Sequence, residues 1–479
     1  MAKIKPPSAI HDLQRLRQSP LPINTSLGPF FNGAFFGRDS IKVGFHLLDT
    51  EPELVEEIIC LLASLQGQET NSLSEEEKGR IFHESRKAEW ADEKGLEILR
   101  TLSQMWGGSE TELLYYGACD TTPDFVRLVG AYCQKYNSLL LDKNIIDNQG
   151  NTTTIRASVA LAANWVMEHL DSSEIGLLEF QRSNPQGLEL QSWKDSRSAY
   201  LYHDGSRLNF SSPVAVLGVQ GSAYDSLLAA LHTLPTHPNA FRWLATANEL
   251  SRNIWGYFWL GDFFAGAIDR NADGNPRRSE IKVSDAGPFL ASGLLSTLSD
   301  KEINYFVEKV ATVLMSEEFL TDVGIRCRSV KNANLTTEPD YHGSWAVWVK
   351  ETYDTAVAFH ERGLPHLALA LENRILHGAA QAGCHRELFW VSPEGQVLYN
   401  PDQEPDDKIP GIYSRKPEPT QAWSVSSVLA IKRRRGENSP LPPMTDFEEK
   451  ILAAIPNIEA PQQTLEDVSS PFYLLEERT

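Results

Sequence analysis

The sequence predicts an all-α fold, because helical patterns recur along most of its 479 residues while strand patterns are rare. Apolar residues return every three or four positions in several long segments, and alternation of apolar and polar residues is confined to short pieces. Strands do not alternate with helices, which disfavours a parallel-sheet fold. Polar and aromatic clusters fill the connections. One architecture that fits this pattern over about 400 residues is a toroid of paired helices, with an inner and an outer ring, a pocket at one end and short β-hairpins in the loops; helix packing permits this fold without singling it out.

Several helices have a recognisable start. One opens at Gly37 after a short aromatic segment, and the next begins near Pro52, since proline suits the first turn of a helix. Ser299 and Glu302 form a capping box, which marks the start of another. Further helices are expected at residues 122–137, 155–170, 243–257, 303–313, 365–382 and 420–434, from their apolar stripes or their flanking motifs.

The chain is expected to form one large domain with two appendages. Residues 1–23 are polar and contain prolines, which indicates an N-terminal arm lying on the body. Residues 24–436 hold the helical patterns and form the predicted toroid, with a polar loop at 67–90. Residues 437–479 are proline-rich and then acidic, which indicates a peripheral tail.

Composition excludes several classes of function. Hydrophobic residues make up 41% of the chain and it has 11 tryptophans, enough for a large core. The net charge of −20 argues against nucleic acid and anionic membrane surfaces as partners, and permits a neutral ligand such as a carbohydrate. The five cysteines are irregularly spaced without a CxxC pair, so neither a zinc site nor a disulfide framework is indicated. With no signal-like start and no membrane-spanning run, we expect a soluble, cytoplasmic protein; nothing indicates an oligomeric state.

The stretch from Gln191 to Ser196 is the first candidate site. It lies between two turn-prone runs, and site residues are often placed on loops. Trp193 precedes Asp195 by two positions, which offers a flat apolar wall beside a carboxyl group. Such a wall suits a sugar ring, and desolvation beside it raises a carboxylic acid's pKa toward the value that a general acid needs. Taken alone, the stretch fits a surface turn better, because short motifs often match by chance.

A set of such clusters occurs along the chain in a known order. The clusters are Phe36–Ser40, Ile81–Arg86, Tyr115–Pro123, Trp193–Ser196, Val219–Gly221, Tyr341–Ser344, Arg386–Phe389 and Thr420–Ser424. Together they resemble the amylo-α-1,6-glucosidase, or glycogen-debranching, family among the six-hairpin-toroid glycosidases, over roughly residues 24–436. Each motif is weak by itself, and the ordered set is specific to the family.

The resemblance implies an (α/α)6 toroid that hydrolyses a glycosidic bond with inversion. Asp195 matches the general acid of the family's W-x-D-S motif, and Glu387 matches its general base. Arg38 and Asp39 match a pair that binds the hydroxyls of a terminal glucose. Further positions that match pocket residues are Glu84, Arg86, Tyr116, Asp120, Trp193, Gln220, His342 and Trp423.

The chain departs from the family pattern at several positions. Relatives usually have glycine where Ser192 stands and glutamate where Gly218 stands, and Arg386 replaces a proline before the proposed base. Glu418 is the alternative base, because it precedes the Trp423 motif. The family's β-rich N-terminal domain is missing, which favours a short substrate. We expect release of terminal α-glucose from an α-1,6 stub or a small α-glucoside, so the partner is a small-molecule or oligosaccharide α-glucoside.

Two other functions stay open from the sequence. A sugar epimerase on the same toroid would use histidines as acid and base, and His83, His342 and His360 are candidates. A catalytically degenerate sugar-binding protein is the second alternative, suggested by Ser192 and Gly218.

Residues 269–280 match a calcium-loop pattern, with acids at the first, fifth and twelfth positions. Pro276 stands where such loops usually place an apolar residue, and the flanking residues indicate strands. We therefore expect a β-hairpin with a polar turn at this place, and neither a metal nor another cofactor in the protein.

Overall fold

The structure, a computed structural model, describes residues 8–18, 20–28, 31, 33–336, 341–397, 417–437 and 440–460. The first seven residues of the predicted arm and the predicted tail beyond residue 460 lie outside the described residues. In the arm, α1 (Ala9–Leu16) is an amphipathic helix that buries Leu13 and Leu16 and contacts α13. The described helix of the arm is therefore packed against the rest of the protein.

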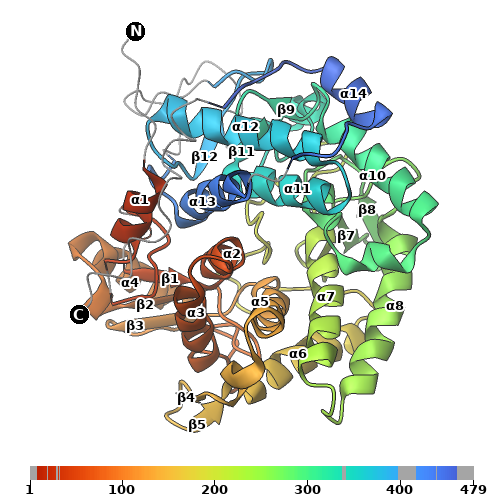
Figure 1. The fold of residues 1–479 in the computed structure, drawn as a ribbon. Coiled ribbons are helices and arrows are strands. Elements are labelled where there is room, and N and C mark those ends of the chain that lie inside the picture. Colours follow the sequence, from red (N-terminus) through yellow and green to blue (C-terminus); the bar gives the residue numbers. More distant parts are fainter. Residues whose placement is uncertain are drawn as a thin grey trace.

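Within the described residues, six inner helices form a closed ring. They are α2 (Gly37–Leu47), α5 (Thr121–Lys135), α7 (Leu217–Thr233), the short α9 (Ala286–Phe289), α11 (Val349–Glu361) and α13 (Ala422–Gly436). Each contacts the next in this order, and α13 contacts α2, so the ring closes (Figure 1). This is the inner ring of the predicted toroid.

An outer helix packs against each inner one. The outer helices are α3 (Pro52–Ser64), α6 (Ile155–Ser172), α8 (Ala240–Phe258), α10 (Asp300–Leu314) and α12 (Pro365–Ala382), which contact α2, α5, α7, α9 and α11 respectively, while α1 contacts α13. The capping box predicted at Ser299 and Glu302 is present at the start of α10. The predicted fold, an all-α toroid of paired helices, is confirmed.

Short antiparallel strands occupy the connections. One three-stranded sheet has the order β1 (Ala34–Phe36), β2 (Glu84–Lys87), β3 (Glu112–Tyr115), and the other β6 (Ala215–Val216), β7 (Ala267–Arg270), β8 (Pro276–Ser279). Two-stranded pairs are β4 (Asn144–Ile146) with β5 (Thr152–Thr154), β9 (Leu320–Thr321) with β10 (Gly324–Ile325), and β11 (Ala346–Trp348) with β12 (Leu388–Trp390). Strands β1, β6 and β11 end immediately before α2, α7 and α11, so they deliver the chain into the ring.

Some elements differ from the prediction. Strand β2 lies inside the segment predicted as a polar loop. The prediction also missed α4 (Glu93–Trp106), α7, α11 and α14 (Asp446–Ala453). Helices α7 and α11 belong to the inner ring and bury residues around most of their circumference, so they lack the one-sided apolar stripe that marks a surface helix. The remaining short segments are 3-10 turns: η1 (Ala88–Trp90), η2 (Ser138–Asp142), η3 (Gly293–Thr297) and η4 (Val330–Leu335).

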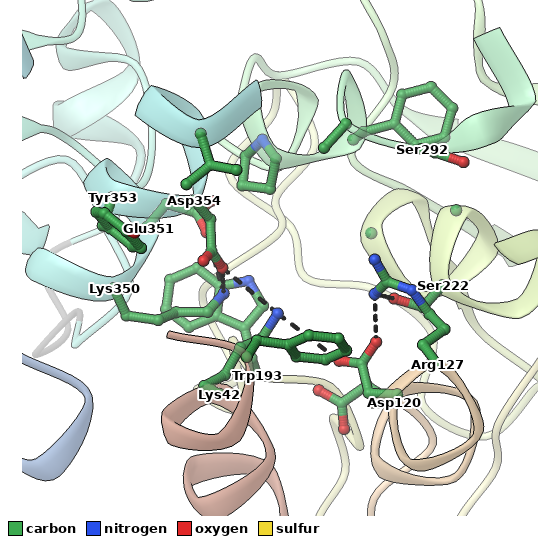
Figure 2. Close-up of a pocket in the computed structure, with 18 of the residues that line it drawn as sticks. Lys42, Asp120, Arg127, Trp193, Ser222, Ser292, Lys350, Glu351, Tyr353 and Asp354 are labelled. Carbon is green, nitrogen blue, oxygen red and sulfur yellow. Dashed lines mark hydrogen bonds and ion pairs between the residues drawn. The ribbon is translucent and has the colours of Figure 1, made fainter. Parts of the chain in front are cut away.

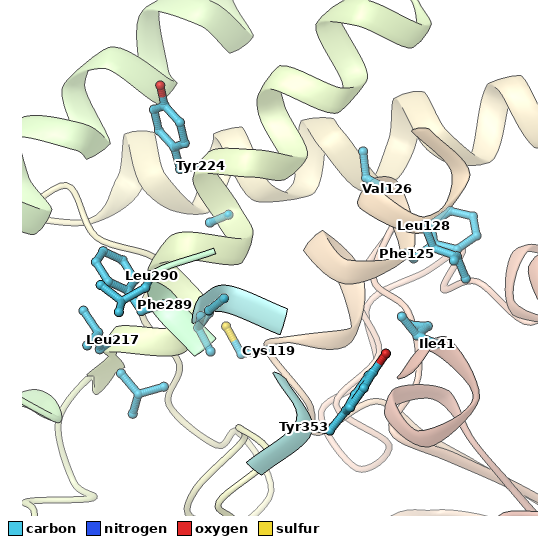
Figure 3. Packing of buried hydrophobic residues seen from close by; sticks show 14 of the residues in the cluster. Ile41, Cys119, Phe125, Val126, Leu128, Leu217, Tyr224, Phe289, Leu290 and Tyr353 are labelled. Carbon is cyan, nitrogen blue, oxygen red and sulfur yellow. The ribbon is translucent and has the colours of Figure 1, made fainter. Parts of the chain in front are cut away.

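One large cluster of buried side chains joins the two rings. Figure 3 shows part of it, with Ile41 of α2 beside α5, and Phe289 beside Leu217 of α7. In the described part of the chain, every helix is too short or too polar to span a membrane.

Candidate active site

The first turns of the inner helices meet at one end of the ring. Arg38, in the first turn of α2, donates from Nε and Nη2 to the carboxylate of Asp120, the N-cap of α5, at 2.7 and 3.0 Å. Gln421, the N-cap of α13, donates from Nε2 to Asp39 Oδ1 at 2.9 Å. These bonds join α2, α5 and α13 by their N-termini, where the helix dipoles favour negative charge.

Three carboxyl groups gather around the start of α2. Burial raises the pKa of Asp39 to about 7, and the nearby negative charges of Glu387 and Asp195 add to this, while Arg38 opposes it. Burial works to lower the pKa of Arg38, but the carboxylates of Asp120, Asp195 and Asp39 raise it overall. The structure therefore brings together the predicted acid, the predicted base and the predicted glucose-binding pair.

Aromatic rings form a wall next to these carboxyls. The Trp193 ring meets His342 and Trp348 edge to face, with centroids 5.2 and 5.8 Å apart. His342 stacks on Trp348 at 4.9 Å, and Trp423 meets the same tryptophan at 5.6 Å. Asp195 is partly exposed, with Oδ1 3.9 Å from His342 Nδ1. Flat rings beside a partly exposed carboxyl suit a sugar ring.

Glu387 is buried just before β12 and holds a defined set of bonds. The hydroxyl of Tyr341 donates to Oε1, and the backbone N–H of Glu418 donates to Oε2 at 3.1 Å. The Glu387 N–H in turn donates to the Glu418 carbonyl at 3.0 Å. The carboxylate of Glu418, the alternative base, accepts from the Ser26 hydroxyl at 2.7 Å.

Trp423 contributes a polar group to this end of the ring. Its side chain is buried at the start of α13, and its Nε1–H has no hydrogen-bond partner among the residues that the structure describes. An unpartnered buried donor is costly to the folded state.

Glu84 and Arg86 lie on β2, beside the strand that leads into α2. Arg86 Nε donates to Glu84 Oε1 at 2.9 Å, and both side chains are buried. Burial lowers the pKa of His83 well below its ordinary value, helped by the charges of Arg38 and Arg86. This pair therefore borders the Arg38 end of the site.

The structure does not bring Tyr116 and Gln220 to this site. The Tyr116 hydroxyl donates to the Leu65 carbonyl at 2.9 Å, and its ring lies in the core. The Gln220 amide bonds to both the N–H and the carbonyl of Leu178, at 2.8 and 2.9 Å. The polar groups of Tyr116 and Gln220 bond to the backbone of neighbouring segments. Neither side chain is therefore expected to contact a substrate.

The histidines of the epimerase alternative do not form an acid–base pair in the described residues. His83 is buried against Phe36 and Tyr115, and His360 is exposed near the C-terminal end of α11, away from the first turns of the ring. His342 alone of the three lies beside Asp195.

The calcium-like segment is a hairpin, as predicted. Strands β7 and β8 pair across a turn in which Gly274 has φ +83°, a value that glycine adopts readily. Both oxygens of Asp269 are engaged, by Arg277 at 3.1 and 3.0 Å and by the Tyr202 hydroxyl at 2.6 Å. No cluster of three or more His, Cys, Asp or Glu residues suited to a metal ion occurs in the described part of the chain.

A cavity of about 530 Å³ lies in the lumen of the ring, next to Arg38 (Figure 2). Charged side chains of the inner helices line it, and Lys42 Nζ, for example, lies 3.4 Å from Asp354 Oδ2. Asp195 and Glu387 are not among its lining residues. Arg38, Asp120 and Trp193 of the candidate site do line it, so the lumen adjoins the gathered carboxyls.

The prediction omitted some residues that the structure places at the site. Tyr341 and Gln421 belong to two of the motifs, but the prediction for those motifs gave the sugar-binding role to His342 and Trp423. Lys194 lies between two predicted residues and is wholly buried. Lys350 carried no signal in the sequence, and its Nζ lies 4.2 Å from the centroid of the Trp193 ring.

Comparisons with known proteins identify the fold. No family model matches the sequence, and no curated protein matches it. Solved structures do match. A GH63 mannosylglycerate hydrolase from Thermus thermophilus in complex with glucose has 15% identity and a TM-score of 0.58, over 89% of this chain and 99% of its own. A wild-type glycosidase has 11% identity and a TM-score of 0.53, over 89% of this chain and 96% of its own. The chain has the fold of these glycosidases. At such identities the likeness concerns the fold, and the chemistry has to be argued from the site.

Proposed function

We propose that the protein is an inverting, exo-acting glycoside hydrolase that releases terminal α-glucose. One observation carries the proposal: Asp195 and Glu387 flank one group of aromatic rings. Asp195 lies 3.9 Å from His342, which stacks on Trp348, and Glu387 accepts from Tyr341, whose ring meets the same tryptophan. Glycoside hydrolysis needs two carboxyl groups on opposite sides of the scissile bond, and a sugar needs flat apolar faces with fixed polar groups.

Each carboxyl has its own role in the proposal. Asp195, in the partly exposed position beside Trp193, donates a proton to the leaving oxygen. Glu387 takes a proton from the attacking water, and the Tyr341 hydroxyl and the Glu418 N–H hold its two oxygens in place. The water attacks the anomeric carbon as the bond to the leaving oxygen breaks, so the configuration inverts.

Arg38 and Asp39 recognise the non-reducing end of the substrate in this proposal. A buried guanidinium and a buried carboxyl offer donors and acceptors to the sugar hydroxyls, and a sugar that lacks them leaves buried polar groups unpaired. A terminal sugar held this way leaves no room for the chain to continue, so cleavage is exo.

We hold two substrate classes as near equals: an α-1,6-linked glucose stub on a glucan, and a small α-glucoside. The stub follows from the motif resemblance. The small glycoside gains support from the structural neighbour named a mannosylglycerate hydrolase, whose name describes a small glycoside as its substrate.

The test is incubation of the purified protein with maltose, isomaltose, glucosylglycerate and a limit dextrin, with free glucose as the readout. Proton NMR of early product distinguishes the anomers, and we expect β-glucose from an α-glucoside. Release of α-glucose contradicts inversion, and release of internal oligosaccharides contradicts exo cleavage. Binding of glucose without any hydrolysis supports the degenerate sugar-binding alternative.

A further inference from the structure

The chain around the proposed acid alternates between two environments. Trp193 and Asp195 are partly exposed at the site, whereas Lys194 between them has no exposed surface. The ammonium group of Lys194 therefore lies in the interior, 5.2 Å from the centroid of the Trp193 ring. A buried ammonium is costly unless it is paired and hydrogen-bonded.

Lys194 is anchored to the starts of two inner helices and to one extended segment. Its Nζ donates to the Ser284 hydroxyl at 2.9 Å, to the carboxylate of Asp285 and to the Cys327 carbonyl at 3.2 Å. Glu351 Oε1 lies 3.7 Å away and accepts from the Ser284 hydroxyl at 2.7 Å. Asp285 is the N-cap of α9, and Glu351 lies in the first turn of α11, so one ammonium group ties the loop to the ring.

The loop is also held by bonds on either side of the acid. Residues 191–198 form no helix or strand, so no ladder of backbone bonds fixes their position. Before the acid, the Gln191 amide donates to Glu75, its side-chain oxygen accepts from Arg80 at 2.6 Å and its carbonyl accepts from the Cys119 N–H at 2.6 Å. After the acid, Ser196 bonds His342 Nδ1 at 3.0 Å and the Ser198 carbonyl accepts from Arg328 at 2.5 Å. Lys194 and Ser196 are the anchored residues directly adjacent to the acid in the chain.

A second lysine completes the arrangement. Lys350 Nζ lies 4.2 Å from the Trp193 ring centroid and 3.4 Å from Glu351 Oε2. Lys194 Nζ lies 5.2 Å from the same ring. The indole therefore contacts two ammonium groups that share one carboxylate, which restrains the ring beside the acid.

We propose that Lys194 is a positioning residue that holds Asp195 where it can protonate the leaving oxygen. This inference rests on the proposed function, because it presupposes that Asp195 is the acid. It predicts a selective defect: loss of the anchor impairs proton donation more than sugar binding.

The test variant is Lys194→Met combined with Asp285→Asn. Removing the lysine alone would leave an acid buried without its partner, which is strongly destabilising. The double change removes one positive and one negative charge, and Glu351 keeps Lys350 and Ser284 as partners. The amide introduced by Asp285→Asn keeps an acceptor for the Tyr200 hydroxyl, which donates to Asp285 Oδ1 at 2.8 Å.

A matched control removes a lysine–aspartate pair of the outer surface. Lys282 and Asp262 are 3.7 Å apart; the lysine is partly exposed and the aspartate is exposed. Lys282→Met with Asp262→Asn makes the same two substitutions away from the site. We expect this control to leave kcat, KM and the melting temperature unchanged.

The readout compares two leaving groups. The first substrate is the glucoside that the wild type cleaves fastest among maltose, isomaltose and glucosylglycerate, whose leaving oxygen needs a proton. The second is α-glucosyl fluoride, in which the C–F bond breaks, fluoride departs with the electron pair without needing a proton, and Glu387 takes the proton of the attacking water. For the double variant we expect kcat on the glucoside to fall about 10²-fold, as a small misplacement can cost. KM and kcat on the fluoride stay close to wild type.

The outcomes separate the possible explanations. Equal losses on both substrates, or no loss on either, overturn the positioning role. Ser284→Ala removes one anchor without stranding a charge and provides a second variant, for which we expect a smaller loss with the same preference for the fluoride. If Asp195→Asn itself fails to spare the fluoride, the proposed acid is wrong, and that failure is distinct from failure of the lysine.

Discussion

At the scale of single residues, the site concentrates negative charge at a place where burial opposes it. Asp195 and Glu387 both raise the pKa of Asp39, and among the charged side chains that act on Asp39 it is Arg38 that offsets them. These buried charges lower the stability of the folded state, as is common in pockets whose polar groups bind a ligand. The consequences can be measured one side chain at a time.

Asp195→Asn and Glu387→Gln should each lower kcat by about 10²- to 10⁴-fold, since each removes a proton-transfer role. Both are close in size to the native side chain, so we expect unchanged melting temperatures. Steady-state kinetics together with thermal unfolding check this. If Glu387→Gln keeps near-normal activity while Glu418→Gln loses it, the assignment of the base is wrong.

Asp39→Asn should stabilise the protein in mildly alkaline buffer and abolish most activity. The folded pKa of Asp39 is raised to about 7 from 3.8, so the folded state binds this proton more tightly than the unfolded state does. That contribution to stability is complete below about pH 4 and is lost as the pH rises through about 7. Asparagine carries no such charge and still accepts from Gln421.

The measurement is the melting temperature of both proteins across pH. The variant should exceed the wild type at about pH 8, and the advantage should shrink toward pH 4. A constant difference at every pH would show that Asp39 does not titrate as described. Asp204→Asn, in an exposed turn, serves as the control substitution.

At the scale of elements, short strands, loops and helix starts place the site residues. The sequence could predict those residues whose position follows from a helix boundary. Arg38 and Trp423 lie at the starts of helices that were predicted, so their placement followed from the helix boundaries. Tyr116 and Gln220 stood in equally good motifs and turned out to fasten backbone segments. A motif gives position along the chain, whereas the direction of a side chain depends on contacts far away in the sequence. Lys350 could not be predicted for the same reason, because it meets Trp193 only once the ring of helices has closed.

The hairpin of β7 and β8 gives a prediction at this scale. Because Asp269 is already bonded to Arg277 and Tyr202, we expect calcium to leave the melting temperature unchanged. Asp269→Ala should lower it with or without calcium, since it leaves the guanidinium without that partner. Thermal unfolding with calcium and with a chelator checks both statements. A rise of several degrees with calcium that is lost in Asp273→Ala would contradict the hairpin interpretation.

At the scale of the whole molecule, charges belt the lumen of the ring and join its inner helices. Lys42 of α2 lies near Asp124 of α5 and Asp354 of α11, at 3.7 and 3.4 Å. Arg127 of α5 bonds Asp124 at 2.6 Å, and Lys350 lies 3.2 Å from Asp354. Two of these four distances, 3.7 and 3.4 Å, are longer than an ordinary hydrogen bond, which leaves space for water in the polar cavity between the helices (Figure 2). The basic run at the end of α13 is likewise paired, since Arg434 and Arg435 both bond Glu372 of α12.

This belt predicts how the ring responds to acid. Burial works to raise the pKa of Asp354, but Lys42, Lys350 and His46 hold it well below 3.8. A carboxyl with a depressed folded pKa contributes stability that is complete above its unfolded value and is lost as the pH falls below about 4. Burial lowers the pKa of His46, which adds a loss in the same direction as the pH falls below about 6.5. Asp354→Asn should therefore be less stable than the wild type near neutral pH, because Lys42 and Lys350 each lose one carboxylate partner, and the difference should narrow in acid. Urea unfolding at about pH 7 and about pH 3.5 measures this, with Glu97→Gln on the exposed face of α4 as the control. A difference that is equal at both pH values would mean that Asp354 does not hold the ring together through its charge.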